Sequence, residues 1–150
     1  PEQFDKVAEL LKNSAMSFSR RSEDNYRNQQ IVLADTLGEL QCLYGVANIS
    51  FIGGSLIKRG GHNPLESAAF SVGVLAGPHT YNFDHIYPEL ISAQGAETVT
   101  DENYLADILI ALSNDAEQTI KLGHQAAKCV ANNQGAISKT VNLIELYLES

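Results

Sequence analysis

The chain has 150 residues, of which 44% are hydrophobic and 19% charged, and its net charge is −8. These values are typical of one globular domain that buries a core, and the charged fraction is too small for a disordered chain. The negative charge argues against a nucleic-acid partner and against an electrostatic contact with anionic lipid. No apolar run reaches the roughly 18 residues that a membrane-spanning helix needs, so we expect a soluble chain that is not inserted in a membrane.

The cysteines and histidines indicate neither a disulfide nor a metal site. Cys42 and Cys129 are far apart in the sequence, and each lies among helix-forming residues. Isolated cysteines of this kind predict reduced, buried thiols in a cytosolic setting. The four histidines have no short mutual spacing, so no metal ligation is predicted.

The N-terminal part of the chain is predicted to contain a helix, two strands and a loop. Residues 1–14 place their apolar side chains on one face of a helix. A short strand follows at 16–19, and residues 20–30 are polar throughout without a large aliphatic side chain, which predicts a mobile surface loop. The β-branched run at 31–34 predicts the second strand.

The middle of the chain alternates helix starts with short apolar strands. Thr36 is followed three residues later by Glu39, the spacing of a capping box, and predicts the start of a helix. A strand is predicted at 48–52, then a glycine-rich loop at 53–61, and Asn63 begins another helix.

The last third of the chain is mainly helical. Strands are predicted at 72–76 and 97–99, with a helix over 83–93 between them. Three further predicted helices form a helical C-terminal tail, over residues 101–112, 116–131 and 135–148.

This order of elements predicts an α/β fold. Strands that alternate with helices form a parallel sheet with helices on both faces. Such sheets bind ligands at the carboxyl ends of their strands, in the turns that lead into helices. Two turns have unusual chemistry for plain connections, residues 34–39 and residues 53–66, and we expect both at the binding edge.

The second of these turns is rich in glycine. Gly53 and Gly54 directly follow an apolar strand and allow the backbone to approach a ligand closely. Ser55 adds a hydroxyl group, and Gly60 and Gly61 form a second flexible corner. The turn therefore has the composition of a ligand-binding loop, although double glycines are also common in plain turns.

The helix after this turn has a well-defined start. Asn63 is a favourable N-cap and Pro64 a favourable first helical residue, and free N–H groups at a helix start suit a phosphate. The Glu66 carboxylate could accept hydrogen bonds from the two hydroxyls of a ribose, or it could bond the N–H of Asn63 in a capping box. The spacing leaves both interpretations open. His62, beside the cap, is typical of a structural hydrogen-bonding residue.

Common fingerprints of other nucleotide and hydrolase sites are missing. The chain contains neither G-x-G-x-x-G nor G-K-[ST], which weakens the NAD and P-loop interpretations. It also lacks the G-x-S-x-G setting of a serine nucleophile, so a hydrolase triad is not predicted.

The segment from Asp35 to Phe83, which includes GGSLIKRGGHNPLE and GPHTYNF, closely resembles the Kdo transferases (3-deoxy-D-manno-octulosonic acid transferases) of Gram-negative bacteria. The resemblance extends over essentially the whole chain. It implies the GT-B glycosyltransferase fold, in which two Rossmann-like domains face each other. Residues 1–150 would then be the C-terminal nucleotide-sugar-binding domain, N-terminally truncated, with the N-terminal acceptor and catalytic domain absent.

The resemblance also implies which residues bind the nucleotide. The turn at 37–39 matches the one that contacts the cytidine of the donor, and the turn at 63–66 matches the one that holds ribose and phosphate, with Glu66 as the ribose ligand. The predicted nucleotide-binding residues are Leu37, Gly38, Glu39, Gly60, Gly61, Asn63, Pro64, Leu65 and Glu66, with Gly53, Gly54, Ser55 and His62 as further candidates.

The activity that the resemblance implies is inverting transfer of Kdo from CMP-Kdo to the lipid A precursor (lipid IVA) in lipopolysaccharide core biosynthesis, without a metal or other cofactor. The general base would lie in the N-terminal domain, so no catalytic residue is expected in this chain, and the isolated chain should be inactive. The expected partners are CMP-Kdo or CMP, the N-terminal domain of the same protein and, through it, the lipid A precursor. The whole enzyme is expected at the cytoplasmic face of the bacterial inner membrane.

Two alternatives remain open at the level of the sequence. One is a GT-B domain for a UDP-sugar donor. The other is a non-catalytic module that binds a nucleotide.

Overall fold

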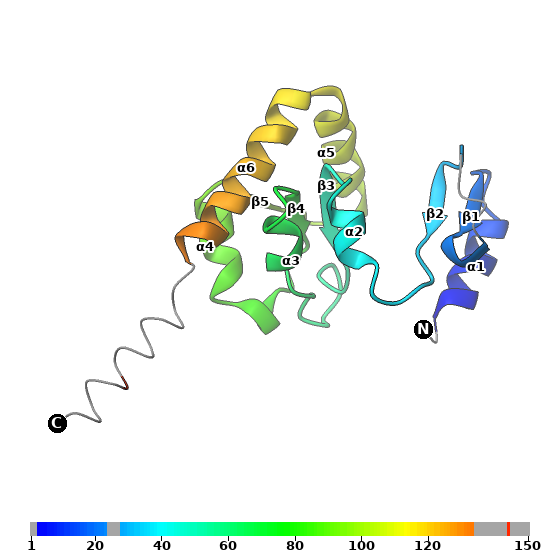
Figure 1. The fold of residues 1–150 in the computed structure, drawn as a ribbon, viewed down its shortest axis with the longest axis horizontal. Helices are drawn as coiled ribbons and strands as arrows, with labels where there is room; N and C mark the ends of the chain where they lie inside the picture. The colour runs from blue at the N-terminus through cyan, green and yellow to red at the C-terminus, as the bar shows by residue number, and fades with distance from the viewer. Residues whose placement is uncertain (1–2, 24–27, 134–143, 145–150) are drawn as a thin grey trace. The chain divides into compact units, whose positions relative to one another are not determined.

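The computed structural model describes residues 3–23, 28–133 and 144. It divides the chain into two compact units, Pro1–Leu40 and Gln41–Ser150. Each unit combines helices with parallel strands (Figure 1), which confirms the predicted α/β class.

The first unit contains a helix and a pair of strands. Helix α1 (Phe4–Lys12) is followed by strand β1 (Phe18–Arg20), the 3-10 turn η1 (Arg21–Glu23) and strand β2 (Ile31–Leu33). The two strands pair in parallel, and α1 packs on them and buries Ala8. The predicted helix and strands are confirmed, apart from their ends.

The predicted surface loop at 20–30 is wrong at its beginning. Arg20 is the last residue of β1, and residues 21–23 form η1. The guanidinium group of Arg20 forms ion pairs with Asp5 and Asp35, at 2.8 and 2.6 Å, and these hold a polar residue inside the strand. Residues 24–27 lie outside the described residues.

The second unit is built on a three-stranded parallel sheet in the order β3-β4-β5. Its strands are β3 (Ile49–Ile52), β4 (Gly73–Ala76) and β5 (Ala96–Thr98), and its helical elements are α2 (Leu40–Tyr44, beginning at the unit boundary), α3 (Leu65–Ala68), the 3-10 turn η2 (Tyr81–Phe83), α4 (Ile86–Ser92), α5 (Glu102–Asn114) and α6 (Ala116–Asn132).

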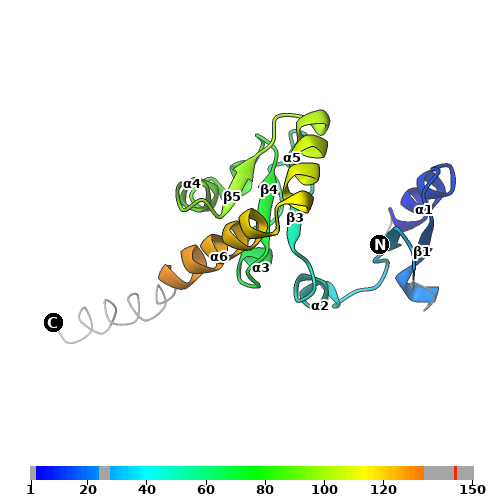
Figure 2. The same ribbon diagram turned by 90° about the horizontal axis from the view of Figure 1, so that it is seen from above.

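The central strand β4 supplies side chains to a core on each face of this sheet. Val74 and Ala76 pack in one core with residues of α3, α4 and α6, whereas Leu75 packs in a second core with α5. Successive side chains of a strand point to opposite faces, so this division follows from the strand itself. Figure 2 shows the strands with α5 on one side and α3 and α6 on the other. The prediction of helices on both faces is therefore confirmed.

Two predicted helices differ from the structure. The helix predicted to open at Thr36 begins only at Leu40, because Gly38 has a φ of +83°, a left-handed conformation that does not continue a helix. The Thr36 hydroxyl donates to the Glu39 carboxylate instead of capping a helix. The helix predicted over 83–93 is divided into η2 and α4.

The helical tail is confirmed where it is described. Asp101 and Asp115 precede α5 and α6, and each carboxylate accepts hydrogen bonds from N–H groups of the first helical turn, which fixes where the helix starts. Of the predicted helix at 135–148, only Ile144 is described. Within the described part of the chain, none of the helices combines the length and the apolar character needed to cross a membrane.

Candidate functional site

Ser55 lies at the start of the glycine-rich turn, where it connects two strand ends. Its side chain is completely buried. The hydroxyl donates to the carbonyl of Ile52 at the end of β3, and it accepts the N–H of Gly77, just after β4, at 2.8 Å. Both hydrogen bonds are internal, so the structure gives Ser55 a position that supports the turn rather than one that faces a ligand.

The corner at Gly60 and Gly61 is held by a segment more than 20 residues further along the chain. The carboxamide nitrogen of Asn82 donates to the carbonyls of Arg59 and Gly61, at 3.1 and 3.2 Å. The backbone N–H of Asn82 donates to the carbonyl of Gly60 at 3.2 Å. Two left-handed residues in a row, with φ of +83° and +68°, give this corner its shape.

The carbonyl of His62, which follows this corner, accepts a hydrogen bond from the segment that begins at Asn82. The hydroxyl of Tyr87, on α4, donates to the carbonyl of His62 at 3.1 Å. Burial raises the pKa of Tyr87 to about 12, so the phenol keeps its proton and remains a donor. The four successive carbonyls of residues 59–62 therefore all bond to residues 82–87.

The N–H groups of the same peptides face the other way. A trans peptide unit directs its N–H opposite to its C=O, and the peptides between residues 59 and 63 are trans. The N–H groups of Gly60, Gly61, His62 and Asn63 therefore point away from residues 82–87. Among the described residues they have no hydrogen-bond acceptor. Successive free N–H groups of this kind are typical of an anion-binding concavity.

Helix α3, which follows the turn, is short. It begins at Leu65, with Pro64 in the N-cap position, and the Leu65 N–H donates to the carboxamide oxygen of Asn63, two residues earlier, at 3.0 Å. Pro64, directly before it, is buried. Because α3 has only four residues, its macrodipole is small, and any contact with a phosphate would depend on individual N–H groups.

Glu66 lies in the first turn of α3 with an exposed side chain. Within the described ranges its carboxylate has no hydrogen-bond or ion-pair partner, so the capping-box bond to the N–H of Asn63 is not formed there. The pKa of Tyr44 is raised, mainly by burial and in addition by the negative charge of Glu66. The exposed carboxylate is therefore open to a ligand.

The turn at 37–39 belongs to the first unit, whereas all other predicted site residues belong to the second. Leu37 is 77% exposed, and a side chain added at Gly38 would meet no atom within 4 Å. The Glu39 carboxylate accepts a hydrogen bond from Arg21 at 3.0 Å in addition to that from Thr36. Leu37 and Gly38 thus leave an open surface, while Glu39 is held by its neighbours.

Asp35, which precedes this turn, is held in place by hydrogen bonds and an ion pair. Its nearly buried carboxylate accepts hydrogen bonds from the hydroxyl and the N–H of Ser22, at 2.7 and 2.9 Å, and pairs with Arg20. These partners, with the Ser22 hydroxyl foremost, hold the pKa of Asp35 far below its usual range although burial acts in the opposite direction. The network ties the end of β2 to the segment after β1.

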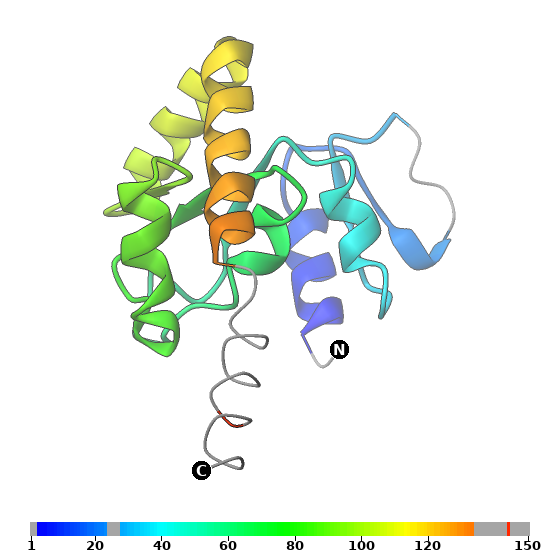
Figure 3. The ribbon, with the colours of Figure 1, turned by 60° about the vertical axis from the view of Figure 1, so that its left-hand side comes forward.

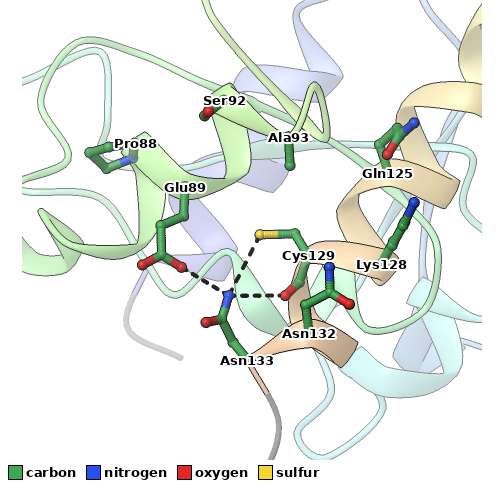
Figure 4. A pocket seen from close by; sticks show the side chains of 9 residues that line it. All are labelled: Pro88, Glu89, Ser92, Ala93, Gln125, Lys128, Cys129, Asn132 and Asn133. Carbon is green, nitrogen blue, oxygen red and sulfur yellow. Dashed lines mark hydrogen bonds between the residues drawn. The ribbon is translucent and has the colours of Figure 1, made fainter.

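A separate cavity of about 560 Å³ lies between α4 and the end of α6. Figure 3 shows these two helices side by side. In the cavity the Asn133 carboxamide nitrogen donates to the carboxylate of Glu89 at 2.9 Å and to the carbonyl of Cys129 at 3.1 Å (Figure 4). No residue predicted for the nucleotide site lines it. The lining residues are Pro88, Glu89, Ser92, Ala93, Gln125, Lys128, Cys129, Asn132 and Asn133.

The two cysteines lie in different environments. Cys129 is buried, and its pKa is raised first by burial and further by Glu89. Cys42 is exposed, so the prediction of a buried thiol is wrong for this residue, because α2 buries none of its side chains. Across residues 3–23, 28–133 and 144, no group of three or more His, Cys, Asp or Glu side chains is placed to hold a metal ion.

Asn82 and Tyr87 were not predicted as part of the site. No local pattern marks Asn82, because its partners at 59–61 are separated from it by more than 20 residues. The pair of glycines at 60–61 signals an unusual corner, but nothing local identifies the side chain that holds it.

Comparison with known proteins places this geometry in context. The chain is 42% identical, over 155 aligned residues and 99% of its length, to a 3-deoxy-D-manno-octulosonic acid transferase of Haemophilus influenzae. It is 29% identical over 99% of its length to the transferase of the same name from Bordetella pertussis. These alignments cover 36% and 35% of the two relatives, so the chain spans about a third of their length. No family model matches the sequence.

A solved structure is similar over most of the chain. It is the C-terminal CMP-Kdo binding domain of WaaA from Acinetobacter baumannii, with a TM-score of 0.81 and 35% sequence identity. The similarity covers 87% of this chain and 69% of that domain. The fold is therefore shared with a domain of known structure.

Proposed function

Because the chain belongs to the family of the 3-deoxy-D-manno-octulosonic acid transferases, we propose that it binds the nucleotide of a CMP-Kdo donor. The observation that carries this proposal is the structural similarity to a domain described as CMP-Kdo binding. In this proposal the chain is the C-terminal domain of a GT-B glycosyltransferase. The whole enzyme, which also has an N-terminal domain, transfers Kdo to the lipid A precursor. Its lipid acceptor would bring the enzyme to the cytoplasmic face of the inner membrane.

Some groups of the glycine-rich turn have no partner among the described residues and are suited to ribose and phosphate. The carboxylate of Glu66 is exposed and unpaired among the described residues, and it can accept hydrogen bonds from both ribose hydroxyls. Gly60 and Gly61 are buried as residues, and the N–H groups of residues 60–63, which have no acceptor among the described residues, are proposed to bind the phosphate. Leu65 and Pro64 shape the start of α3 between these groups. Separately, for the first unit by itself, we propose that the open turn of Leu37 and Gly38, with Glu39, contacts a cytidine.

The proposed chemistry is an inverting displacement. A hydroxyl of the acceptor attacks the anomeric carbon of Kdo, the bond from that carbon to the phosphate oxygen breaks, and CMP leaves. Negative charge grows on the leaving phosphate, and N–H groups that are already oriented stabilise it without reorganisation. The proton of the attacking hydroxyl passes to a general base, which we assign to the N-terminal domain. No metal ion is needed in this scheme.

An NMR titration of the chain with CMP tests the site. We expect chemical-shift changes to concentrate at residues 37–39 and 53–66. Shifts confined to other residues, such as those around the cavity at Cys129, would refute the placement. Titration with UMP and UDP in parallel distinguishes a UDP-sugar enzyme, which should prefer the uridine nucleotides.

A second experiment tests whether this chain can transfer Kdo without the N-terminal domain. The chain alone, supplied with CMP-Kdo and lipid IVA, should form no Kdo-lipid product, while CMP binding persists. Product formation by this chain alone would show that the general base is here. If the chain binds CMP but the whole protein also fails to transfer Kdo, the result would favour a non-catalytic nucleotide-binding module.

A further inference from the structure

The turn at residues 59–62 owes its conformation to the side chain of Asn82. Two of its carbonyls accept hydrogen bonds from the Asn82 carboxamide, and a third accepts one from the Asn82 backbone. A Cβ atom added at Gly60 would lie closer than 3.0 Å to the Asn82 carboxamide. The contact is thus tight as well as hydrogen-bonded, and it fixes the position of the turn against η2.

These hydrogen bonds also determine the direction of the N–H group of each peptide. A left-handed corner of two glycines has several accessible conformations. Bonding the carbonyls of Arg59, Gly60 and Gly61 to Asn82 selects one of them. In that conformation the N–H groups of residues 60–62 point away from η2, on the side that the proposed function assigns to the donor phosphate.

We propose that Asn82 is a positioning residue of the donor site, whose carboxamide orients the free N–H groups of the glycine corner toward the phosphate of the nucleotide. The inference rests on the proposed function, because it needs a nucleotide at this turn. Asn82 itself does not contact the phosphate in this scheme. Tyr87 has a supporting part, since its hydroxyl holds the following carbonyl, that of His62, at 3.1 Å.

The role predicts an effect that depends on the phosphate. Asn82→Asp keeps the shape of the side chain but replaces the amide donor with a carboxylate, which repels the carbonyls of Arg59 and Gly61. The corner should then turn, and the affinity for CMP should fall about tenfold, as expected when a hydrogen bond to a charged group is lost. The affinity for cytidine, which has no phosphate, should remain within about twofold of wild type.

Asn114→Asp is the matched control. The carboxamide of Asn114, at the end of α5, also donates to a backbone carbonyl, that of Ile110, at 2.8 Å. Its replacement should leave both affinities unchanged. Asn82→Ser removes the carboxamide without adding a charge and should weaken CMP in the same selective way. Amide NMR spectra of the free variants report whether the fold is retained and whether Gly60 and Gly61 have moved.

Each outcome decides one of the two proposals. Equal losses of CMP and cytidine affinity in both Asn82 variants would mean that Asn82 only supports the fold, and unchanged CMP affinity would exclude any part in binding. If wild-type protein binds CMP no more tightly than cytidine, the phosphate is not held by this corner and the inference fails, while nucleotide binding stands. If wild-type protein binds neither ligand, the proposed function itself fails.

Discussion

The hydroxyl of Ser55 accepts the N–H of Gly77 at 2.8 Å and so ties the turn after β3 to the end of β4. Gly77 is itself required there, because a Cβ atom at this position would lie closer than 3.0 Å to the backbone of Ser55. The ends of β3 and β4 are therefore joined by a hydrogen bond and by close packing. The glycine-rich turn begins at this junction, so its first residues have a fixed position.

Ser55→Ala should lower the free energy of unfolding by about 1–3 kcal/mol, because the buried N–H of Gly77 loses its acceptor. Urea denaturation monitored by NMR signals of β3 and β4 measures the change. Ser50→Ala is the control, because the half-buried hydroxyl of Ser50 makes only a 3.3 Å bond to the carbonyl of Gly73. Equal costs for the two variants would contradict the special position of Ser55.

Glu66→Gln should weaken CMP binding by about 1.5–3 kcal/mol, since a hydrogen bond to a charged carboxylate is lost. The free energy of unfolding should change by no more than about 0.5 kcal/mol, because the side chain is exposed. Calorimetric titration and thermal unfolding measure the two quantities. Glu102→Gln, an exposed first-turn glutamate of α5, should affect neither. A variant at Glu66 that unfolds more easily but binds CMP normally would show that Glu66 is a capping residue.

Gly60→Ala and Gly38→Ala should differ although both glycines have a φ of +83°. Each alanine incurs the left-handed backbone cost of about 1–2 kcal/mol. Gly38 has open space around it, whereas at Gly60 the new methyl group collides with Asn82. We therefore expect the larger loss of stability, and a loss of CMP affinity, for Gly60→Ala. Thermal unfolding and CMP titration compare the two, and a milder effect at Gly60 would contradict the contact with Asn82.

The first unit should lose stability in acid because of Asp35. Its pKa is lower in the folded chain than in the unfolded chain, so the unfolded chain binds the extra proton more readily. The stabilising contribution is complete above about pH 4 and is lost as the pH falls below that value toward the folded pKa. Amide NMR signals of Ser22 and Ala34, followed during acidification, measure this transition.

Asp35→Asn provides the comparison for this titration. The variant lacks the titrating group, so the first unit should be less stable at neutral pH and its stability should depend less on pH below about 4. Asp107→Asn, an exposed substitution on α5, is the control. An acid transition of the same size in Asp35→Asn would mean that another carboxylate is responsible.

The sequence by itself determined the α/β class, most of the strands and helices, and the location of the glycine-rich turn. These features depend on local patterns: short apolar runs for β3 and β4, and helical periodicity for α5 and α6. The segment from Asp35 to Phe83, with GGSLIKRGGHNPLE and GPHTYNF, also indicated the transferase family, because it is a long continuous stretch of specific residues.

The tertiary structure decided what the side chains around that turn do. Only the fold brings Asn82 to the carbonyls of residues 59–61, and only the pairing of β3 with β4 makes Ser55 an internal connection. The late start of α2 likewise follows from the left-handed backbone at Gly38, which the capping-box pattern did not reveal. The physical reason is common to all three: contacts between residues far apart in the chain, and backbone torsions, leave no periodic signal in the sequence.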